Sequence, residues 1–342
     1  MKLSFLFFSA DSSVASGDRY RQVLDCARFA DERGFEAIWT PERHFDDFGG
    51  LYPNPSVLGA ALAVSTRRVR IRAGSVVLPL HHPVRVAEEW AVVDNLSGGR
   101  VDVAFASGWH PSDFVFAPAA YRQRRERMLA SLRVVRDLWA GGEATLEGPD
   151  GTPVTVAIRP RPVQPRLPVW LTATSRPETF AAAADLGCGV LTALVGQPLD
   201  RLAENVRLYR SRYRPSDPDA GGGGHVTLML HTFVGTDNAH VKRSVREPLQ
   251  EYVRGYLAQH ERFASRLGSA TERQREALAA LAFDHYYRSD SLLGTPAKCR
   301  SIVAQAAAAG VDEIACLIDF GLPQDEVLAS LELLDGVRRE VA

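Results

Sequence analysis

The sequence predicts an α/β protein built as a (β/α)8 barrel of the TIM type with insertions, and three observations favour this fold. Short apolar, β-branched runs alternate with amphipathic segments along most of the 342 residues, which is typical of parallel strands joined by right-handed crossovers. Eight strand–helix units can be distinguished, and eight units close naturally into a barrel. No Gly-x-Gly-x-x-Gly follows the first strand, so a doubly wound dinucleotide-binding sheet is disfavoured.

The first four units occupy the N-terminal part of the chain. Their strands are runs of apolar and β-branched residues that include VRIRAGSVVL, and they are expected at 2–9, 35–40, 69–78 and 100–106. Their helices are expected where apolar side chains recur every three or four residues, at 18–33, 55–65, 84–96 and 120–140. Gly34 ends the first of these helices, since glycine adopts the conformation that commonly follows a helix.

The last four units follow the same pattern, with three interruptions. Their strands are expected at 167–172, 189–194, 226–234 and 313–318, and their helices at 177–186, 199–213, 296–309 and 324–341. The interruptions within this single 1–342 domain are a predicted hairpin with a Pro-Asp-Gly turn, a Gly-rich surface loop and a helical insertion before the last unit, at 141–165, 214–224 and 238–291. Insertions of this length at a barrel's loops are typical of enzymes.

The composition excludes several classes of function. With 40 basic and 41 acidic side chains and 46% apolar residues, the chain lacks the basic excess that binding to nucleic acid or an anionic membrane requires. The N-terminal apolar run is too short for a signal peptide, so we expect a cytoplasmic protein. The four cysteines lie far apart without metal-ligand spacing, and neither a disulfide framework nor a metal site is indicated: Cys26, Cys188, Cys299 and Cys316.

Candidate catalytic groups follow the strands, because active sites of such barrels lie at the carboxyl ends of the strands. His44 is the sharpest candidate, since a neutral imidazole accepts or donates a proton near neutral pH; the alternative is a loop histidine held by ordinary hydrogen bonds. Glu42 either orients His44 or forms a local ion pair with Arg43. Asp113 is either a site carboxylate or a helix N-cap.

The other histidines are weaker candidates. His110 has the same two interpretations as His44. His81 and His82 are equally well explained as half-buried polar groups at the mouth, and we favour this explanation for His82. The remaining five lie outside these loops and are assigned no function: His225, His231, His240, His260 and His285.

The segment Thr174-Ser175-Arg176-Pro177-Glu178-Thr179 opens a helix. A helix N-terminus offers unpaired N–H donors and a partial positive charge, and arginine adds a bidentate fork for phosphate oxygens. We therefore favour a phosphate site here over an ordinary helix start. A phosphate cradle beside apolar loops, with no metal cluster or nucleophile motif, fits a bound flavin at the barrel mouth.

These stretches resemble the bacterial luciferase-like, flavin-dependent monooxygenases almost from end to end. The resemblance rests on 35–55, 74–100, 107–114, the helix start at Ser175 and 293–320. The motifs PERHF, SGWHPSDF and GVDEIACLIDFG further resemble the branch associated with natural-product biosynthesis. That branch oxidises free or carrier-protein-bound intermediates.

The resemblance implies a function and a set of partners. It implies a TIM-like barrel, often a homodimer, that binds reduced FMN (FMNH2) supplied by a separate NAD(P)H:flavin reductase. With O2, a flavin C4a-hydroperoxide then hydroxylates a small-molecule or carrier-tethered substrate or inserts oxygen into it. Two other functions also occur on this barrel: hydride transfer with the deazaflavin F420, and flavin binding without turnover.

The resemblance also implies roles for single residues in the cofactor site. Ser175 matches the family's phosphate-contacting serine, and Arg176 and Thr179 lie in the same loop. Gly74-Ser75 falls where the luciferase has a cis peptide next to the flavin ring. Ala106 and Ser107 stand where the luciferase has a cysteine and an arginine beside the flavin, so light emission is not expected while oxygen chemistry is.

On the substrate side, His44 matches the second histidine of a luciferase His-His pair, and Arg43 replaces the first. We expect His44 to hydrogen-bond the oxygenated cofactor or shuttle its proton. Arg43 would stabilise negative charge or anchor the substrate. Trp109 and His110 would line the substrate cavity, and the insertion at 238–291 would act as a lid that excludes water.

Overall fold

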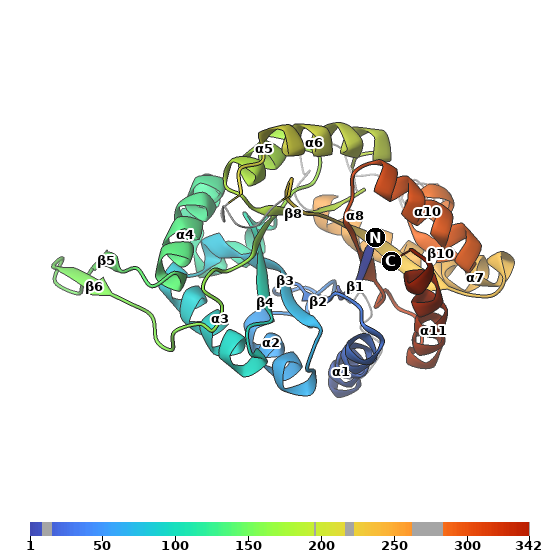
Figure 1. Cartoon of the computed structure of the whole chain (residues 1–342), viewed down its shortest axis with the longest axis horizontal. Helices are drawn as coiled ribbons and strands as arrows, with labels where there is room; N and C mark the ends of the chain where they lie inside the picture. Colours follow the sequence, from blue (N-terminus) through green and yellow to red (C-terminus); the bar gives the residue numbers. More distant parts are fainter. Residues whose placement is uncertain (9–15, 195, 216–221, 262–282, 342) are drawn as a thin grey trace.

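A computed structural model describes residues 1–8, 16–194, 196–215, 222–261 and 283–341. Eight parallel strands form a closed barrel inside a ring of helices (Figure 1), in the order β9-β11-β1-β2-β3-β4-β7-β8, and the β8–β9 pairing closes it. The strands are β1 (Lys2–Leu6), β2 (Ala37–Thr40), β3 (Arg70–Val77), β4 (Val101–Ala106), β7 (Val169–Thr172), β8 (Gly189–Ala193), β9 (Val226–Val234) and β11 (Glu313–Leu317). The predicted (β/α)8 barrel is confirmed.

The helices lie close to their predicted positions. They are α1 (Ser16–Arg33), α2 (Pro55–Ser65), α3 (Pro83–Ser97), α4 (Arg124–Trp139), α5 (Pro177–Asp185), α6 (Leu199–Arg212), α10 (Pro296–Ala308) and α11 (Gln324–Val341). Local chemistry sets their ends: the Asn54 side chain accepts the N–H groups of Ser56 and Val57 at the start of α2, and Gly98, at a φ of +67°, ends α3. The helix predicted from residue 120 starts later, because two short 3-10 turns that begin at prolines precede α4: η2 (Pro111–Phe116) and η3 (Pro118–Gln123).

The insertions add structure outside the barrel. Residues 141–165 contain the antiparallel hairpin of β5 (Ala144–Glu147) and β6 (Pro153–Val156), which projects away from the barrel in Figure 1. Within 238–291, α7 (Asn238–Ser244) and α8 (Arg246–Glu261) are described, and 262–282 lie outside the described residues, as do 216–221 of the Gly-rich loop. A short strand that the sequence did not predict, β10 (Leu292–Gly294), pairs with the end of β9.

Charged side chains fill the N-terminal end of the barrel. Arg72 donates to Glu313 at 2.7 Å and to Asp102 at 2.6 Å. Its guanidinium lies between the rings of Trp39 and Trp170, 4.8 Å and 4.7 Å from their centroids. Burial alone would raise the pKa of Glu313, but the Arg72 charge and hydrogen bonds hold it well below its ordinary range. This buried ion pair closes the end of the barrel opposite the loops that carry the candidate site.

In the part of the chain that the structure describes, no helix is both long and apolar enough to cross a membrane.

Candidate functional site

Glu42 joins two histidines at the mouth of the barrel. The loop after β2 and the turn after β3 lie side by side, since these two strands pair in the sheet. One Glu42 oxygen, Oε1, lies 2.9 Å from Nε2 of His44 and 2.6 Å from Nε2 of His81. The other, Oε2, accepts the backbone N–H of Val77 at 2.6 Å. The structure thus brings Glu42 to His44 and adds His81, which the sequence had left unassigned.

These contacts set the charges of the cluster. Burial alone would raise the pKa of Glu42, but the hydrogen bonds from His44, His81 and Val77 lower it below its ordinary value. Burial alone would lower the pKa of His81, but the hydrogen bond and charge of Glu42 raise it. Glu42 is therefore an anion at neutral pH, and both histidines present Nε2–H to it. In a neutral His44 ring with Nε2–H directed at Glu42, Nδ1 is the acceptor nitrogen.

Arg43 is paired with an acid other than Glu42. Its guanidinium makes a salt bridge to Asp113 and donates to the carbonyl of His44 at 2.9 Å. The alternative of a Glu42–Arg43 ion pair is therefore wrong, and Asp113 is no N-cap, since His110 occupies that position of η2. Because Asp113 neutralises Arg43, this arginine brings no uncompensated positive charge to the mouth.

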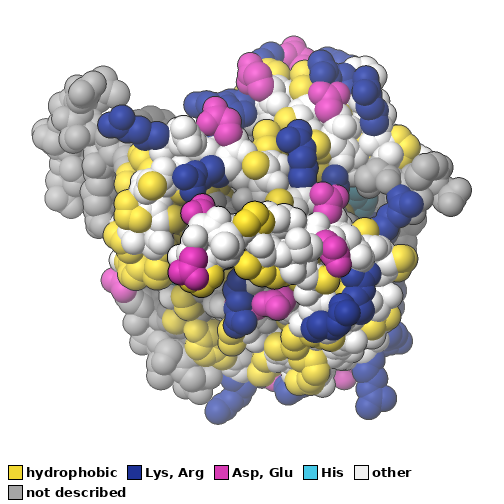
Figure 2. Space-filling model, turned by 90° about the vertical axis from the view of Figure 1, so that its left-hand side faces the viewer, with side chains coloured by type: hydrophobic (Ala, Val, Ile, Leu, Met, Phe, Trp, Pro, Cys, Tyr) yellow, Lys and Arg dark blue, Asp and Glu magenta, His cyan; other side chains and the backbone are white. Residues whose placement is uncertain are grey.

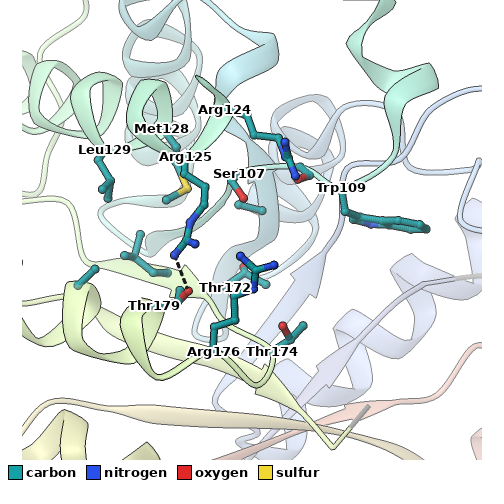
Figure 3. A pocket seen from close by; sticks show the side chains of 14 residues that line it. Ser107, Trp109, Arg124, Arg125, Met128, Leu129, Thr172, Thr174, Arg176 and Thr179 are labelled. Carbon is teal, nitrogen blue, oxygen red and sulfur yellow. Dashed lines mark hydrogen bonds between the residues drawn. The ribbon is translucent and has the colours of Figure 1, made fainter. Parts of the chain in front are cut away.

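A cavity of about 250 Å³ opens at the carboxyl ends of β4 and β7. Figure 3 shows its residues, which come from the ends of both strands, from the loops after them, and from α4 and α5. Five residues predicted from the sequence line it: Ala106, Ser107, Trp109, Arg176 and Thr179. Seven further side chains line it that the sequence had not singled out for the site: Arg124, Arg125, Met128, Leu129, Leu171, Thr172 and Ala182.

One side of this cavity collects donors for an anion. Arg125 from α4 and Arg176 from the start of α5 both extend into the space (Figure 3), and Arg125 donates to the Thr179 hydroxyl at 3.2 Å. The N-cap position of α5 is Arg176, which makes no side-chain cap hydrogen bond, so the first N–H groups of the helix have no side-chain cap. Two guanidinium groups, a hydroxyl and a helix N-terminus suit a phosphate. The apolar walls from Met128, Leu129 and Leu171 suit the rest of a flavin.

Three predicted cofactor residues lie beside the cavity without lining it. Ser175 sits between two residues that do, Thr174 and Arg176. The Gly74–Ser75 peptide is cis, as the resemblance implies, and the Ser75 hydroxyl hydrogen-bonds that of Thr172 in the cavity wall. A side chain at Gly74 would meet the Trp39 ring at 3.0 Å, so the position favours glycine.

Trp109 connects the cavity with the Glu42 cluster. It lines the cavity, and the Arg43 guanidinium lies 5.6 Å from its ring centroid. His110 is buried next to it and hydrogen-bonds Ser112. His82, which we expected to be half-buried, is exposed.

The described part of the 238–291 insertion packs over the barrel mouth. Tyr252 of α8 lies 4.8 Å from Phe48 and 4.5 Å from His231, ring centroid to ring centroid. Val245 and Leu249 join the same apolar cluster as the barrel residues Leu6 and Leu317. The helices of the insertion therefore cover one side of the opening.

The family now follows from comparison with known proteins. The sequence profile of the luciferase-like monooxygenases matches residues 1–313. The chain belongs to this family. Its resemblance to flavin-dependent monooxygenases, inferred from the sequence, is confirmed, and a flavin is the cofactor that the family supports.

Two curated relatives of this luciferase-like monooxygenase carry informative names. The oxygenase component of a flavin-dependent trigonelline monooxygenase from Acinetobacter baylyi is 27% identical over 327 residues, 92% of this chain and 87% of that protein. A 4-hydroxyprotoasukamycin monooxygenase from Streptomyces nodosus subsp. asukaensis is 28% identical over 284 residues, 81% of this chain and 74% of that protein.

Solved structures share the fold of this luciferase-like monooxygenase. The monooxygenase RslO1 from Streptomyces bottropensis superposes with a TM-score of 0.80 at 24% identity and covers 98% of both chains. The FMN complex of the oxygenating constituent of 3,6-diketocamphane monooxygenase from Pseudomonas putida gives 0.78 at 17% identity, covering 100% of this chain and 98% of that one.

Proposed function

We propose that this luciferase-like monooxygenase binds reduced FMN in the cavity between β4 and β7 and uses O2 to oxygenate a secondary-metabolite intermediate, free or tethered to a carrier protein. The observation that carries the proposal is the meeting of Arg125, Arg176 and Thr179 at the uncapped start of α5. The relative named for 4-hydroxyprotoasukamycin supports a natural-product substrate. The relative named as an oxygenase component supports a separate NAD(P)H:flavin reductase as partner.

In this proposal, the chain's own residues bind the cofactor, orient the His44 ring and shield the site from water. FMNH2 would supply two electrons, so that one atom of O2 enters the product and the other leaves as water, with FMN as the oxidised product. Arg125, Arg176 and Thr179 hold the phosphate. His44 accepts or donates a proton at Nδ1 while Glu42 fixes its ring, and α8 helps to exclude water at the mouth. Trp109 forms the wall between the cofactor and the substrate.

The phosphate site makes a direct prediction. Arg125→Ala is expected to weaken binding of oxidised FMN at least tenfold, because a charge-assisted contact to phosphate is worth about 1.5–3 kcal/mol. Binding of riboflavin, which has no phosphate, is expected to change less than twofold. Isothermal titration calorimetry of both ligands measures this difference.

Arg127→Ala is the matched control, since Arg127 is an exposed arginine of the same helix that does not line the cavity. It is expected to leave both affinities unchanged. If Arg125→Ala weakened the binding of FMN and of riboflavin equally, the phosphate of FMN would not be bound by Arg125. Turnover is tested by mixing the FMNH2-loaded protein with O2, and tight binding of F420 in place of FMN would instead indicate the hydride-transfer function.

We also propose that the protein is a homodimer that associates through α2 and α3. Four large apolar side chains on these neighbouring helices are exposed: Val57, Val64, Val92 and Leu96. Figure 1 shows α2 and α3 side by side at the bottom of the ring of helices, and Figure 2 shows hydrophobic side chains among charged ones on the lower part of the neighbouring face. Exposed apolar side chains gathered on two neighbouring helices fit a protein–protein interface.

Val64→Glu is expected to convert the dimer to a monomer, because the variant would bury a charge in an apolar interface. Multi-angle light scattering at micromolar concentration gives the mass. Val154→Glu, at an exposed valine of the β5–β6 hairpin, is the control that keeps the dimer. A monomeric parent protein, or a Val64→Glu variant with the dimer's mass, would contradict this assignment.

A further inference from the structure

Two phenylalanine rings stand in solvent beside His44. Phe45 is 63% exposed and Phe116 is 56% exposed. Their centroids are 5.3 Å apart with 36° between the ring planes. We call this pair the Phe45–Phe116 platform. Single exposed apolar residues need no explanation, but two adjacent rings at the rim of a site do.

The local structure holds both rings outward. Phe45 has a φ of +57°, a conformation that bulky residues rarely adopt. On η2, Phe114 is buried and packs 5.0 Å from the Tyr121 ring. This anchor fixes the short turn that carries Phe116. Phe116 therefore sits on a turn that is packed against the barrel, close to the Phe45 ring.

The platform is continuous with the candidate site. The His44 ring lies 5.6 Å from Phe45 and 4.9 Å from Phe116, meeting Phe116 edge to face at 73°. On its other side the same imidazole contacts Glu42. Next to His44 in the chain, Arg43 reaches Trp109, which lines the cavity. A ligand lying on the platform would thus be beside the imidazole to which we assign proton transfer.

We propose that the Phe45–Phe116 platform binds a flat aromatic ring system of the substrate. The inference rests on the proposed function, because it takes the platform to serve the molecule that is oxygenated. Aromatic rings prefer offset-stacked and edge-to-face neighbours, and the platform offers two exposed rings beside the His44 imidazole, with Trp109 beyond Arg43. A flexible alkyl chain would gain contact area here but no ring–ring geometry.

The test compares two probes with the same ten-carbon skeleton and one hydroxyl group, 2-naphthol and decahydro-2-naphthol. Only the first is flat and aromatic. Equilibrium dialysis against the full-length protein, with and without saturating oxidised FMN, gives the affinity of each. We expect 2-naphthol to bind the parent protein at least tenfold more tightly than its saturated analogue.

Variants assign that preference to the platform. In the double variant Phe45→Ala, Phe116→Ala the preference is expected to disappear, while the FMN affinity stays within twofold and the mass is unchanged. Phe45→Tyr with Phe116→Tyr keeps the rings and is expected to keep the preference within threefold. Val154→Ala with Val163→Ala removes exposed apolar side chains elsewhere and serves as the matched control.

Several results would overturn the inference. Equal binding of the two probes by the parent protein, or a preference that survives in the double alanine variant, excludes an aromatic ligand on the platform. Loss of FMN affinity in that variant assigns the platform to the flavin, and a changed mass assigns it to a protein partner. If FMN fails to bind the parent protein but the platform-dependent preference is present, the proposed function fails and the aromatic site stands.

Discussion

Arg72→Met is expected to lower the free energy of unfolding by about 3–5 kcal/mol at pH 7, the usual result of removing one partner from a buried ion pair. Methionine fills much of the same volume between Trp39 and Trp170. Its thioether, however, leaves Glu313 fully buried without its main counter-charge. The loss therefore reflects an unpaired buried carboxylate more than lost packing. Urea unfolding followed by circular dichroism measures the change.

The pH dependence separates these two causes. In the parent protein the lowered pKa of Glu313 stabilises the fold at pH values above the carboxyl's ordinary pKa, and this stabilisation is lost as the pH falls. Without Arg72, the burial of Glu313 is opposed mainly by His225 and Ser4, so its pKa is expected to rise and the folded variant to take up a proton more readily than the parent. The stability gap between the two proteins is therefore expected to be widest near pH 7 and to narrow towards pH 4.

A surface ion pair provides the comparison. Arg85 pairs with Glu89 at 2.8 Å, but 69% of its side chain is exposed. Arg85→Met is expected to change the unfolding free energy by less than about 1 kcal/mol, as is usual for exposed pairs. Two results would show that packing rather than charge stabilises this end of the barrel. One is a loss of unfolding free energy below about 1 kcal/mol in Arg72→Met, and the other is a difference in unfolding free energy between the two proteins that stays constant with pH.

The strands and helices of the barrel could be predicted because their signals are local. α2 and α11 match their predicted bounds, since the apolar spacing is regular in both and a proline stands at the start of each, with Asn54 as an additional cap for α2. The strand expected at 69–78 lies within one residue of β3 at both ends, because its apolar pattern is equally local. β10 was missed because three residues give too short a pattern, and its pairing with β9 depends on the fold.

The contacts of the site could be predicted from the sequence only where both residues lie in one loop or in the loops after adjacent strands. Glu42 was linked to His44 by sequence proximity, and His81 joins them because β2 and β3 are adjacent in the barrel. The bond from Arg43 to Asp113 connects loops after β2 and β4, which are not adjacent strands. No sequence pattern indicates that pairing, so the sequence offered Glu42 as the partner of Arg43 instead.

Arg125 was missed for a different reason. The run RQRRER at 122–127 has the composition of a solvated helix face, and arginine is common throughout the chain. A usable signal was nevertheless present: β4 and β7 are consecutive barrel strands, so the helix after β4 starts beside the loop after β7. Arginines at the start of α4 therefore face the helix start that the sequence had already marked for phosphate.

Glu42→Gln is the second change with a large expected effect. The carboxylate accepts three N–H groups, from His44, His81 and Val77. An amide has one oxygen and an NH2 group that only donates, so at least one of these donors must lose its acceptor. We expect one imidazole to turn or change tautomer, and His44 to lose its fixed orientation. Glu42 acts here as a positioning residue.

The expected loss is about 10²-fold in product formed per reduced flavin, the lower range for a misplaced general acid–base group. The pKa of His81 gives a readout that does not depend on turnover. In the parent protein Glu42 raises that pKa; without the charge, burial dominates and the His81 pKa falls. NMR titration of the histidine ring protons follows this shift directly.

Glu89→Gln is the matched control, because Glu89 also acts on His81 through its charge but makes no hydrogen bond to it. It is expected to keep nearly full product yield and to lower the His81 pKa less than Glu42→Gln does. Oxidised FMN should bind both variants as it binds the parent, since neither residue lines the cavity. If Glu42→Gln retains full yield while the His81 pKa falls, the carboxylate sets the charge of the cluster without positioning His44 for catalysis.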